Sequence, residues 1–351
     1  MIKEGIDFEE VANTGILAKI VGRKTDSTAC VVLRADIDAL PIQEANGSAF
    51  DSVYENVMHA CGHDFHTANL LSVLKLLHAH REEFSGIVLG VFQPAEEKIP
   101  GGAKAVLESQ KLNAYDIKAV VGLHVSPKYE IGNVAIRAGK FMASSDEIFI
   151  TVNGKGGHGA QPHLNIDPVV ISSQLVVSLQ QIVSRLANPA IPSVLSIGKI
   201  IANGAINVIP NEVYLEGTFR TMDENWRSKA LSIIEKQIQE LPALYGATVT
   251  YEIRRGYPAL INHVALTHEI TTSLIEFHGK DAVHEAEIWM AAEDFAYYTS
   301  AYPAVFYLVG IANQQKGIGS ELHTPTFLID EDAFDLAIGG MMYTALRLLE
   351  N

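Results

Sequence analysis

Short apolar runs, several of them rich in β-branched residues, alternate with stretches of helical periodicity along the first 135 residues. The apolar runs are ACVVLRAD at 29–36, IVLGVF at 87–92 and IKAVVGLHV at 117–125. Each predicts a strand that is buried on both faces. Residues 66–80 and 101–110 instead have the spacing of helices. Strands that alternate with helices predict a mainly parallel sheet with helices on both faces.

A different pattern occupies the middle of the chain. The elements expected there are a strand at 147–154, a helix at 167–186, strands at 193–201 and 212–220, a helix around 224–240 and a strand at 247–254. This order, β-α-β-β-α-β, is that of a ferredoxin-like domain. The α/β pattern returns afterwards, with a strand expected at 304–310 and a helix at 331–349.

These patterns predict an α/β protein with one domain inserted into another. We expect residues 1–139 and 257–351 to form a discontinuous domain around the mainly parallel sheet. Residues 140–256 are expected to form an inserted ferredoxin-like α+β domain. The two connecting stretches, 139–146 and 254–258, are the expected hinges for closure of one domain on the other.

Composition agrees with this layout and excludes some partners. The chain has 351 residues, of which 48% are hydrophobic, and this length favours two domains. Its 26 Lys and Arg against 41 Asp and Glu give a net charge of −15, so neither nucleic acid nor an anionic membrane is an expected partner. No run approaches 18 apolar residues, so no membrane span is expected. The acidic start MIKEGIDFEE and the two cysteines, Cys30 and Cys61, favour a cytoplasmic protein without disulfides.

Candidate chemistry follows the predicted strands of the larger domain. Asp36 ends the first strand, Glu96 and Glu97 follow the second, and His124 ends the third. In open α/β sheets, sites form beyond the carboxyl ends of the strands, so these side chains are expected to meet. His323, near the end of the chain, precedes a proline turn and is a further candidate.

The segment HACGHDFHT at 59–67 adds a dense group of polar residues. Cys61 and His63 are two residues apart, so in an extended loop both can face one ion, and thiolate with imidazole suits zinc and similar metals. For His59 and His66, a supporting or surface position is favoured over direct ligation. Adjacent acids such as Glu96 and Glu97 usually form a solvated turn. After a buried strand, however, one can face a metal while the other faces an attacking water.

Taken together, the motifs resemble those of the M20 family of metallo-aminoacylases and peptidases. They are similar above all to its amidohydrolase branch, which includes hippurate hydrolase, N-acetyldiaminopimelate deacetylase and the indole-acetyl-amino-acid hydrolases. The matching segments span the chain in family order: LRADIDALPI (33–42), MHACGHDFHT (58–67), FQPAEE (92–97), GLHV (122–125), GKGGHGAQPH (154–163), NVIPNEVYLEGTFR (207–220), AAEDFAYY (291–298) and HTPTF (323–327).

The resemblance assigns roles to individual residues. It implies that two divalent ions are bound, with manganese, zinc, nickel and cobalt all open as their identity. The implied ligands are Cys61, His63, Glu97, His124 and His323. By the same resemblance, Glu96 is the general base that activates the attacking water, and Asp36 is the second catalytic acid, which orients the ligands.

Three further roles in the inserted domain are implied less directly. His158 resembles a residue that crosses the interface of a homodimer to stabilise the oxyanion. Asn207 and Arg220 are candidate contacts to the carboxylate or the oxyanion of the substrate. The resemblance also implies that the discontinuous domain, 1–139 and 257–351, is the catalytic, metal-binding one. It implies that the inserted domain, 140–256, is a lid and dimerisation domain through which a homodimer forms.

The implied activity is metal-dependent hydrolysis of the amide bond of N-acyl amino acids, as in deacetylases and aminoacylases. A dipeptidase or carboxypeptidase of the same family is one alternative, and a catalytically silent, metal-stabilised binding or assembly protein is another. The chain departs from the family in two places. Members usually begin with about thirty further residues that include an LHxxPEL-like stretch, and other branches have a histidine where this chain has Arg34.

Overall fold

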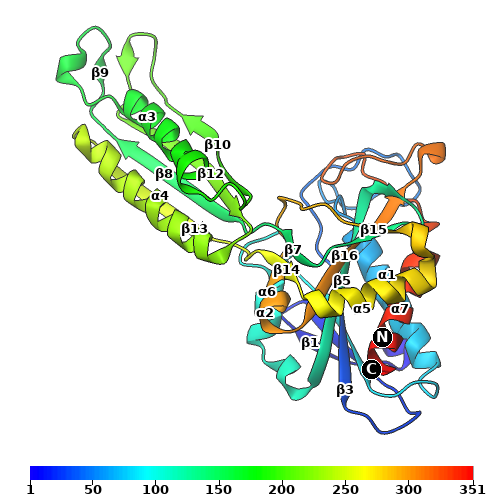
Figure 1. Ribbon diagram of the computed structural model, residues 1–351. Coiled ribbons are helices and arrows are strands. Elements are labelled where there is room, and N and C mark those ends of the chain that lie inside the picture. Colours follow the sequence, from blue (N-terminus) through cyan, green and yellow to red (C-terminus); the bar gives the residue numbers. More distant parts are fainter. Residues whose placement is uncertain (351) are drawn as a thin grey trace. The chain divides into compact units, whose positions relative to one another are not determined.

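Two compact units make up the computed structural model, which describes residues 1–350 (Figure 1). The larger unit combines Met1–Phe141, Ile261–Ile288 and the chain from Asp294 onward. The smaller unit combines Met142–Leu260 with the short segment Trp289–Glu293. The larger unit is therefore discontinuous in sequence, and the smaller one lies almost entirely within a single insertion.

An eight-stranded sheet is the centre of the larger unit. Its strand order is β1-β2-β4-β3-β5-β16-β6-β15. The strands are β1 (Asp7–Val11), β2 (Gly15–Val21), β3 (Ala29–Asp36), β4 (Ile87–Gln93), β5 (Asp116–Glu130), β6 (Val134–Ile136), β15 (Val283–Glu285) and β16 (Ala304–Ala312). The central pairs β4–β3, β3–β5 and β5–β16 are parallel, whereas the β1–β2, β2–β4 and β16–β6 pairs are antiparallel. This confirms the expected α/β class with a mainly parallel sheet.

Helices cover the central strands on both faces. Every residue of β16 is buried, and so is every residue of β3 after Ala29, as strands enclosed between two helical layers require. One group of helices that pack on one another is α1 (His63–Ala79), α5 (Val264–His278) and α7 (Ala333–Glu350). The other is the pair α2 (Gly102–Glu108) and α6 (Ala296–Ala301), which contact β4 and β16 respectively.

The structure also contains elements that the hydrophobic pattern did not reveal. β1 has a single buried residue, Val11, and therefore lacks the apolar run that marks the central strands. β6 and β15 have only three residues each, too few for any periodicity. Helix α5 was likewise not predicted, although its apolar face is buried against α7.

The smaller unit has the expected β-α-β-β-α-β order. Its elements are β8 (Asp146–Asn153), α3 (Pro168–Gln181), β10 (Ser193–Ile201), β12 (Glu212–Thr221), α4 (Glu224–Leu244) and β13 (Thr248–Arg255). The four strands form an antiparallel sheet in the order β10-β12-β8-β13, in which β10 is an edge strand. Both helices begin at an aspartate whose carboxylate accepts backbone N–H groups, Asp167 for α3 and Asp223 for α4.

Short ladders complete the chain. β9 (Gly157–His158) pairs with β11 (Val208–Ile209) in the smaller unit. β7 (Gly139–Met142) pairs with β14 (Leu260–Asn262), where the chain leaves the larger unit and returns to it. The segment Trp289–Glu293 also differs from the expected boundaries, because a hydrogen bond from the Ala143 N–H to the Ala291 carbonyl joins it to the smaller unit.

One helical stretch among the described residues, Pro168–Leu186, is long and apolar enough to cross a membrane by length and composition alone. It consists of α3 and the π-helical turn Ile182–Leu186 that follows it. Ile171, Leu175 and Leu179 are buried in the apolar core of the smaller unit. One face of the stretch therefore packs on this core, and 28% of its apolar window is buried.

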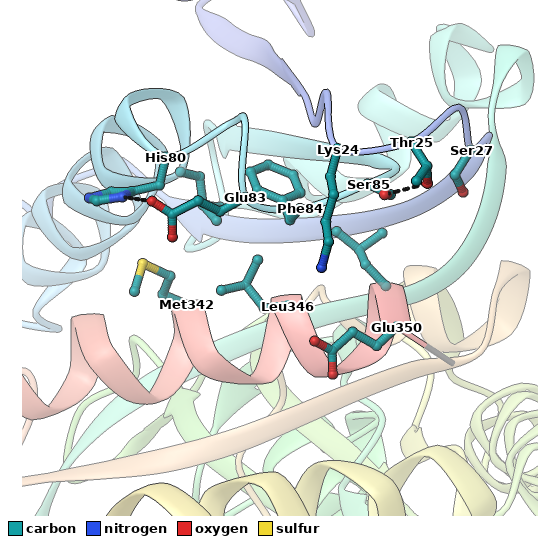
Figure 2. A pocket seen from close by; sticks show the side chains of 12 residues that line it. Lys24, Thr25, Ser27, His80, Glu83, Phe84, Ser85, Met342, Leu346 and Glu350 are labelled. Atoms are coloured by element: carbon teal, nitrogen blue, oxygen red, sulfur yellow. Dashed lines mark hydrogen bonds and ion pairs between the residues drawn. The ribbon is translucent and has the colours of Figure 1, made fainter.

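A groove of about 630 Å³ opens at the amino ends of β3 and β4 (Figure 2). Ser27 and Ser85, which line it, precede those two strands. Leu346 on α7, Phe84 and Lys24 are among the residues that line it. None of the candidate site residues lines this groove, and Asp36, Glu96 and Glu97 lie at the opposite ends of the same two strands.

Substitution of Gly102 tests how tightly the start of α2 is packed. A Cβ atom at this position would lie 1.7 Å from the carbonyl oxygen of Pro94, which is backbone and cannot rotate away. We expect Gly102→Ala to lower the free energy of unfolding by about 3 kcal/mol in urea titrations. Gly319→Ala is the control, since nothing lies within 4 Å of its Cβ position, and a change within about 0.5 kcal/mol is expected. Equal stability of the two variants would contradict this packing.

Candidate metal centre

The carboxyl ends of three parallel strands bring the first group of candidate residues to one edge of the sheet. Asp36 is the last residue of β3. Glu96 and Glu97 lie in the turn after β4, and His124 lies in the buried part of β5. Since β3 pairs in parallel with both β4 and β5, these side chains reach the same edge.

Cys61 lies at the centre of the predicted ligands. Its Sγ atom is 3.4 Å from Nε2 of His124 and 3.2 Å from Nε2 of His323. Nε2 of His323 is in turn 3.1 Å from Oε1 of Glu97. In each of three triplets the donor atoms lie within 4.8 Å of one another: Cys61 with His63 and His124, Cys61 with Glu97 and His323, and His63 with Glu96 and Glu97. The structure thus brings together all five predicted ligands and Glu96.

His63 shows that this group fits a metal ion. Its Nδ1 lies 3.1 Å from the backbone oxygen of Asp38 and donates its proton there, whereas the buried Nε2 has no hydrogen-bond partner. Oδ2 of Asp36 is 3.7 Å from this nitrogen, beyond hydrogen-bond distance, and a buried ring nitrogen without a hydrogen bond is costly unless something binds it. A ligating histidine has this arrangement, with one nitrogen on the metal and the other held by an oxygen.

The electrostatics of the group point the same way. Burial alone would lower the pKa of His63, but Asp36, Asp38 and Glu97 raise it to about 9. Burial raises the pKa of the Cys61 thiol well above its usual range, and the carboxylates of Glu97 and Glu96 raise it further. Both shifts reflect an excess of negative charge in a buried place. A divalent cation would neutralise that charge and permit the thiolate form.

Asp36 and Asp38 form hydrogen bonds that hold residues of the group in place. Burial would raise the pKa of Asp36, but His63, Arg34 and His66 hold it well below its usual range. Its carboxylate accepts hydrogen bonds from Nη1 of Arg34 at 2.7 Å and from Nδ1 of His66 at 2.5 Å. Asp38 accepts the backbone N–H of Glu97 at 2.9 Å and so fixes the turn that carries both acids.

His66 has the supporting position that the sequence favoured. Its Nε2 accepts the backbone N–H of Val125 at 3.0 Å, so the proton must be on Nδ1, which faces Asp36. Burial lowers the pKa of His66, and the ring is therefore neutral near pH 7. His66 thus connects Asp36 to the backbone next to His124.

Three residues with positive φ shape the site. Gly62, with φ 79°, lies between Cys61 and His63, and a Cβ there would lie 2.5 Å from Cγ2 of Val125. Ala95 has φ 56° and His323 has φ 61°, values that residues with side chains seldom adopt. The two acids that follow Ala95 have different neighbours. Glu97 faces His323, whereas Oε1 of Glu96 lies 3.4 Å from the backbone N–H of Asp294.

The remaining candidates belong to the smaller unit and do not form one group there. His158 on β9 is exposed and pairs with Val208, next to Asn207. Arg220 lies near the other end of β12, half-buried, and donates from Nη1 to the carbonyl of Met290 at 3.2 Å. Asn211, which precedes β12, accepts the N–H of Gly156. The length of strand β12, about 30 Å, therefore separates Arg220 from the other two residues.

Sequence reasoning missed a buried network next to the site. Arg34 donates to Asp36, Gln93 and Asp294, and all four side chains are buried. Arg34 lies in an apolar strand, where a charge signals a buried partner. That partner, Asp294, is 260 residues away, and no periodicity connects the two.

Comparisons with known proteins agree with this geometry. Residues 32–346 match the model of peptidase family M20/M25/M40. The chain is 37% identical over 350 residues to thermostable carboxypeptidase 2 of Saccharolobus solfataricus, covering 99% of this chain and 87% of the relative. It is 37% identical over 357 residues to N-acetyl-L-cysteine deacetylase of Bacillus subtilis, covering 99% and 81%. Among solved structures, the YXEP protein of Bacillus subtilis, described as a dinuclear metal binding peptidase from the M20 family, superposes with a TM-score of 0.81 at 32% identity, covering 99% of this chain and 89% of that one.

The family model covers most of the chain, and both relatives align along almost all of it. The residues that meet at this sheet edge belong to the sequence motifs that resemble those of the M20 family. This chain therefore belongs to peptidase family M20/M25/M40 and is a hydrolase of amide or peptide bonds.

Proposed function

We propose that this enzyme hydrolyses the amide bond of N-acyl amino acids, as a deacetylase or aminoacylase, with Glu96 as its general base. The observation that carries the proposal is the meeting of Glu96 with His63 and Glu97 at one sheet edge, where their donor atoms lie within 4.8 Å. The deacetylase among the relatives, which is named for an N-acetyl amino acid, supports this substrate class.

Cys61, His63, Glu97, His124 and His323 would hold two divalent ions. Thiolate and imidazole donors suit zinc, nickel, cobalt and manganese to different degrees, and the set does not select one of them. Bound there, the ions would supply Lewis-acid polarisation of the amide carbonyl and of the attacking water.

The chain's own residues then move the proton. Glu96 accepts a proton from the water as its oxygen bonds to the carbonyl carbon. It returns that proton to the amide nitrogen as the C–N bond breaks, which yields a carboxylic acid and a free amine. Glu96 is only 6% exposed, so bulk water does not compete for the carboxylate. Asp36 keeps His66 and the neighbouring ligands in place through the hydrogen bonds described above.

A dipeptidase or carboxypeptidase activity is the second candidate. The same proton transfer cleaves a peptide bond, and a carboxypeptidase is among the relatives. The two activities differ only in the group on the carbonyl side of the bond. A panel that contains N-acetyl amino acids and dipeptides of the same amino acids separates them.

We also propose a homodimer through the smaller unit, in which His158 acts on the site of the partner. Exposed apolar side chains lie on α3 and on the edge strand β10, where Val177 is 68% and Ile200 is 54% exposed, and beyond β10, where Ile206 is fully exposed. An unpaired edge strand with apolar neighbours favours pairing with a second copy. The distance of about 30 Å between His158 and Arg220 supports the same arrangement, because one copy cannot place both on one oxyanion.

Glu96→Gln tests the general base. The substitution keeps the size of the side chain but removes the proton acceptor, so we expect two metal ions per chain and a kcat lowered by about 10³. Metal analysis and hydrolysis of N-acetyl amino acids are measured side by side with the wild type. Glu108→Gln, an exposed change at the end of α2, serves as the control and should keep full activity. Undiminished turnover by Glu96→Gln would contradict the assignment.

Removal of metal should lower stability. Ions that bind only the folded chain add about 2.7 kcal/mol when their concentration is 100 times the dissociation constant. We therefore expect a chelator to lower the Tm and added zinc or manganese to restore it. In the Cys61→Ala variant, added metal should raise the Tm much less than in the wild type. A Tm that does not depend on metal would count against the donor set.

Mixing two inactive variants tests the role of His158. A dimer of one Glu96→Gln chain and one His158→Ala chain contains one complete site only if His158 acts on the partner. Random exchange of subunits then restores roughly a quarter of the wild-type activity. Mixing Glu96→Gln with Glu96→Ala is the control and restores none. No recovery in the first mixture, with exchange verified by mass, would show that His158 acts within its own chain or not at all.

A further inference from the structure

Arg34 is one of the most deeply buried charged residues of the larger unit, and it lies beside the metal site without belonging to it. It is 1% exposed and is the largest fully buried side chain among the described residues. Nothing in the mechanism above uses it. Burial of a guanidinium removes its hydration and destabilises the fold unless several acceptors form hydrogen bonds with it. Arg34 therefore requires several such acceptors.

The guanidinium connects three segments that are distant in sequence. Nη1 donates to Asp36 at the end of its own strand at 2.7 Å. Nε donates to Oε1 of Gln93, the last residue of β4, at 3.0 Å. Nη2 donates to Oδ1 of Asp294, just before α6, at 2.8 Å. Each nitrogen of the planar fork has an acceptor, and a lysine ammonium cannot reproduce that geometry.

The hydrogen bonds that Asp294 accepts hold it in place, although carboxylate oxygens of Glu96 and Glu293 lie within 4.8 Å of it. Besides Arg34, it accepts from Nε2 of Gln93, at 2.9 and 2.8 Å to its two oxygens, and from the backbone N–H of Ala103 at 2.9 Å. Burial raises the pKa of Asp294, whereas Arg34 and the hydrogen bonds from Ala103 and Gln93 favour its ionised carboxylate. The amide of Gln93 is held in the matching orientation, because its oxygen also accepts the hydroxyl of Tyr298 at 3.2 Å.

Two paths lead from this network to the reacting groups. The backbone N–H of Asp294 faces Oε1 of Glu96 at 3.4 Å, so the place of Asp294 sets a contact of the general base. On the other side, Asp36 holds His66, which in turn accepts the N–H of Val125 next to His124. A shift of Arg34 would therefore change both paths together.

We propose that Arg34 is a positioning residue for this hydrolase: by binding Asp36 and Asp294 at once, it holds Glu96 and the metal ligands in one fixed relation. The inference rests on the proposed function for Glu96. A purely structural salt bridge would contribute to folding stability alone. A positioning residue also affects kcat and the geometry of the metal ligands.

Two substitutions separate the two paths. Arg34→Lys keeps the charge but loses the fork, so both carboxylates are released. Asp294→Asn keeps the shape but turns an amide NH₂ towards a donor, which disturbs only the path to Glu96. Leu274→Ala on α5 is the matched control, since it removes a fully buried side chain that has no part in the network.

The measurements are metal content, the visible absorption spectrum of the Co²⁺-loaded protein, Tm, kcat and KM for an N-acetyl amino acid that the wild type hydrolyses. We expect both network variants to bind two metals and to lose roughly 10- to 100-fold in kcat, with KM changed less than about threefold. The Co²⁺ spectrum should shift in Arg34→Lys but not in Asp294→Asn. Leu274→Ala should lower the Tm while its kcat and spectrum match the wild type.

The double variant Arg34→Lys with Asp294→Asn adds a second criterion. If both residues act through one network, its loss in kcat is smaller than the product of the two single losses. Unchanged kcat in both single variants, or losses that multiply, would overturn the proposal. If the wild type hydrolyses none of the substrates, the proposed function fails, and the Co²⁺ spectrum of Arg34→Lys then decides alone. A shift supports the positioning role, and a spectrum identical to the wild type rejects it.

Discussion

The concentration of negative charge at one buried sheet edge is the constraint on which the rest of the larger unit depends. Carboxylates from Asp36, Glu96 and Asp294, together with the thiol of Cys61, lie in a place from which water is largely excluded. Such a group would repel itself and be protonated unless cations balance it. Arg34 supplies one permanent positive charge from within the chain. The pKa of His63 is raised because the carboxylates of Asp36, Asp38 and Glu97 act on it as well. Bound metal ions would neutralise the negative charge that Arg34 does not balance.

The backbone is arranged to satisfy this constraint. Parallel strands deliver Asp36 and the turn after β4 to the same edge, and α1 begins at His63, so that its first residues face the site. The residues with left-handed φ, Ala95 and His323, lie at the points where the chain must turn a ligand or a base inward. Local strain of this kind persists only where the surrounding packing holds it.

Much of this arrangement can be predicted from the sequence. The apolar runs locate β3, β4 and β5, and the polar residues that follow them predict a site at their ends, because strand direction alone brings such residues together. Contacts that depend on tertiary packing cannot be predicted in this way. The pairing of Arg34 with Asp294 and the tautomer of His66 have no local signature, since each depends on a partner from another element. The weak strands β1, β6 and β15 were missed for the same reason: their neighbours, rather than their own sequences, make them strands.

The insertion of the smaller unit has a consequence for how the chain is made. Ala304 at the start of β16 pairs in parallel with Val120 on β5, about 180 residues earlier. A ribosome that adds 5–20 residues per second needs about 10–35 s to cover that distance. Throughout that time one edge of β5 has no strand beside it, while the inserted segment can already form its own antiparallel sheet. The newly made enzyme therefore passes through a stage in which the four-stranded sheet of the smaller unit can form while one edge of β5 is still open to other chains.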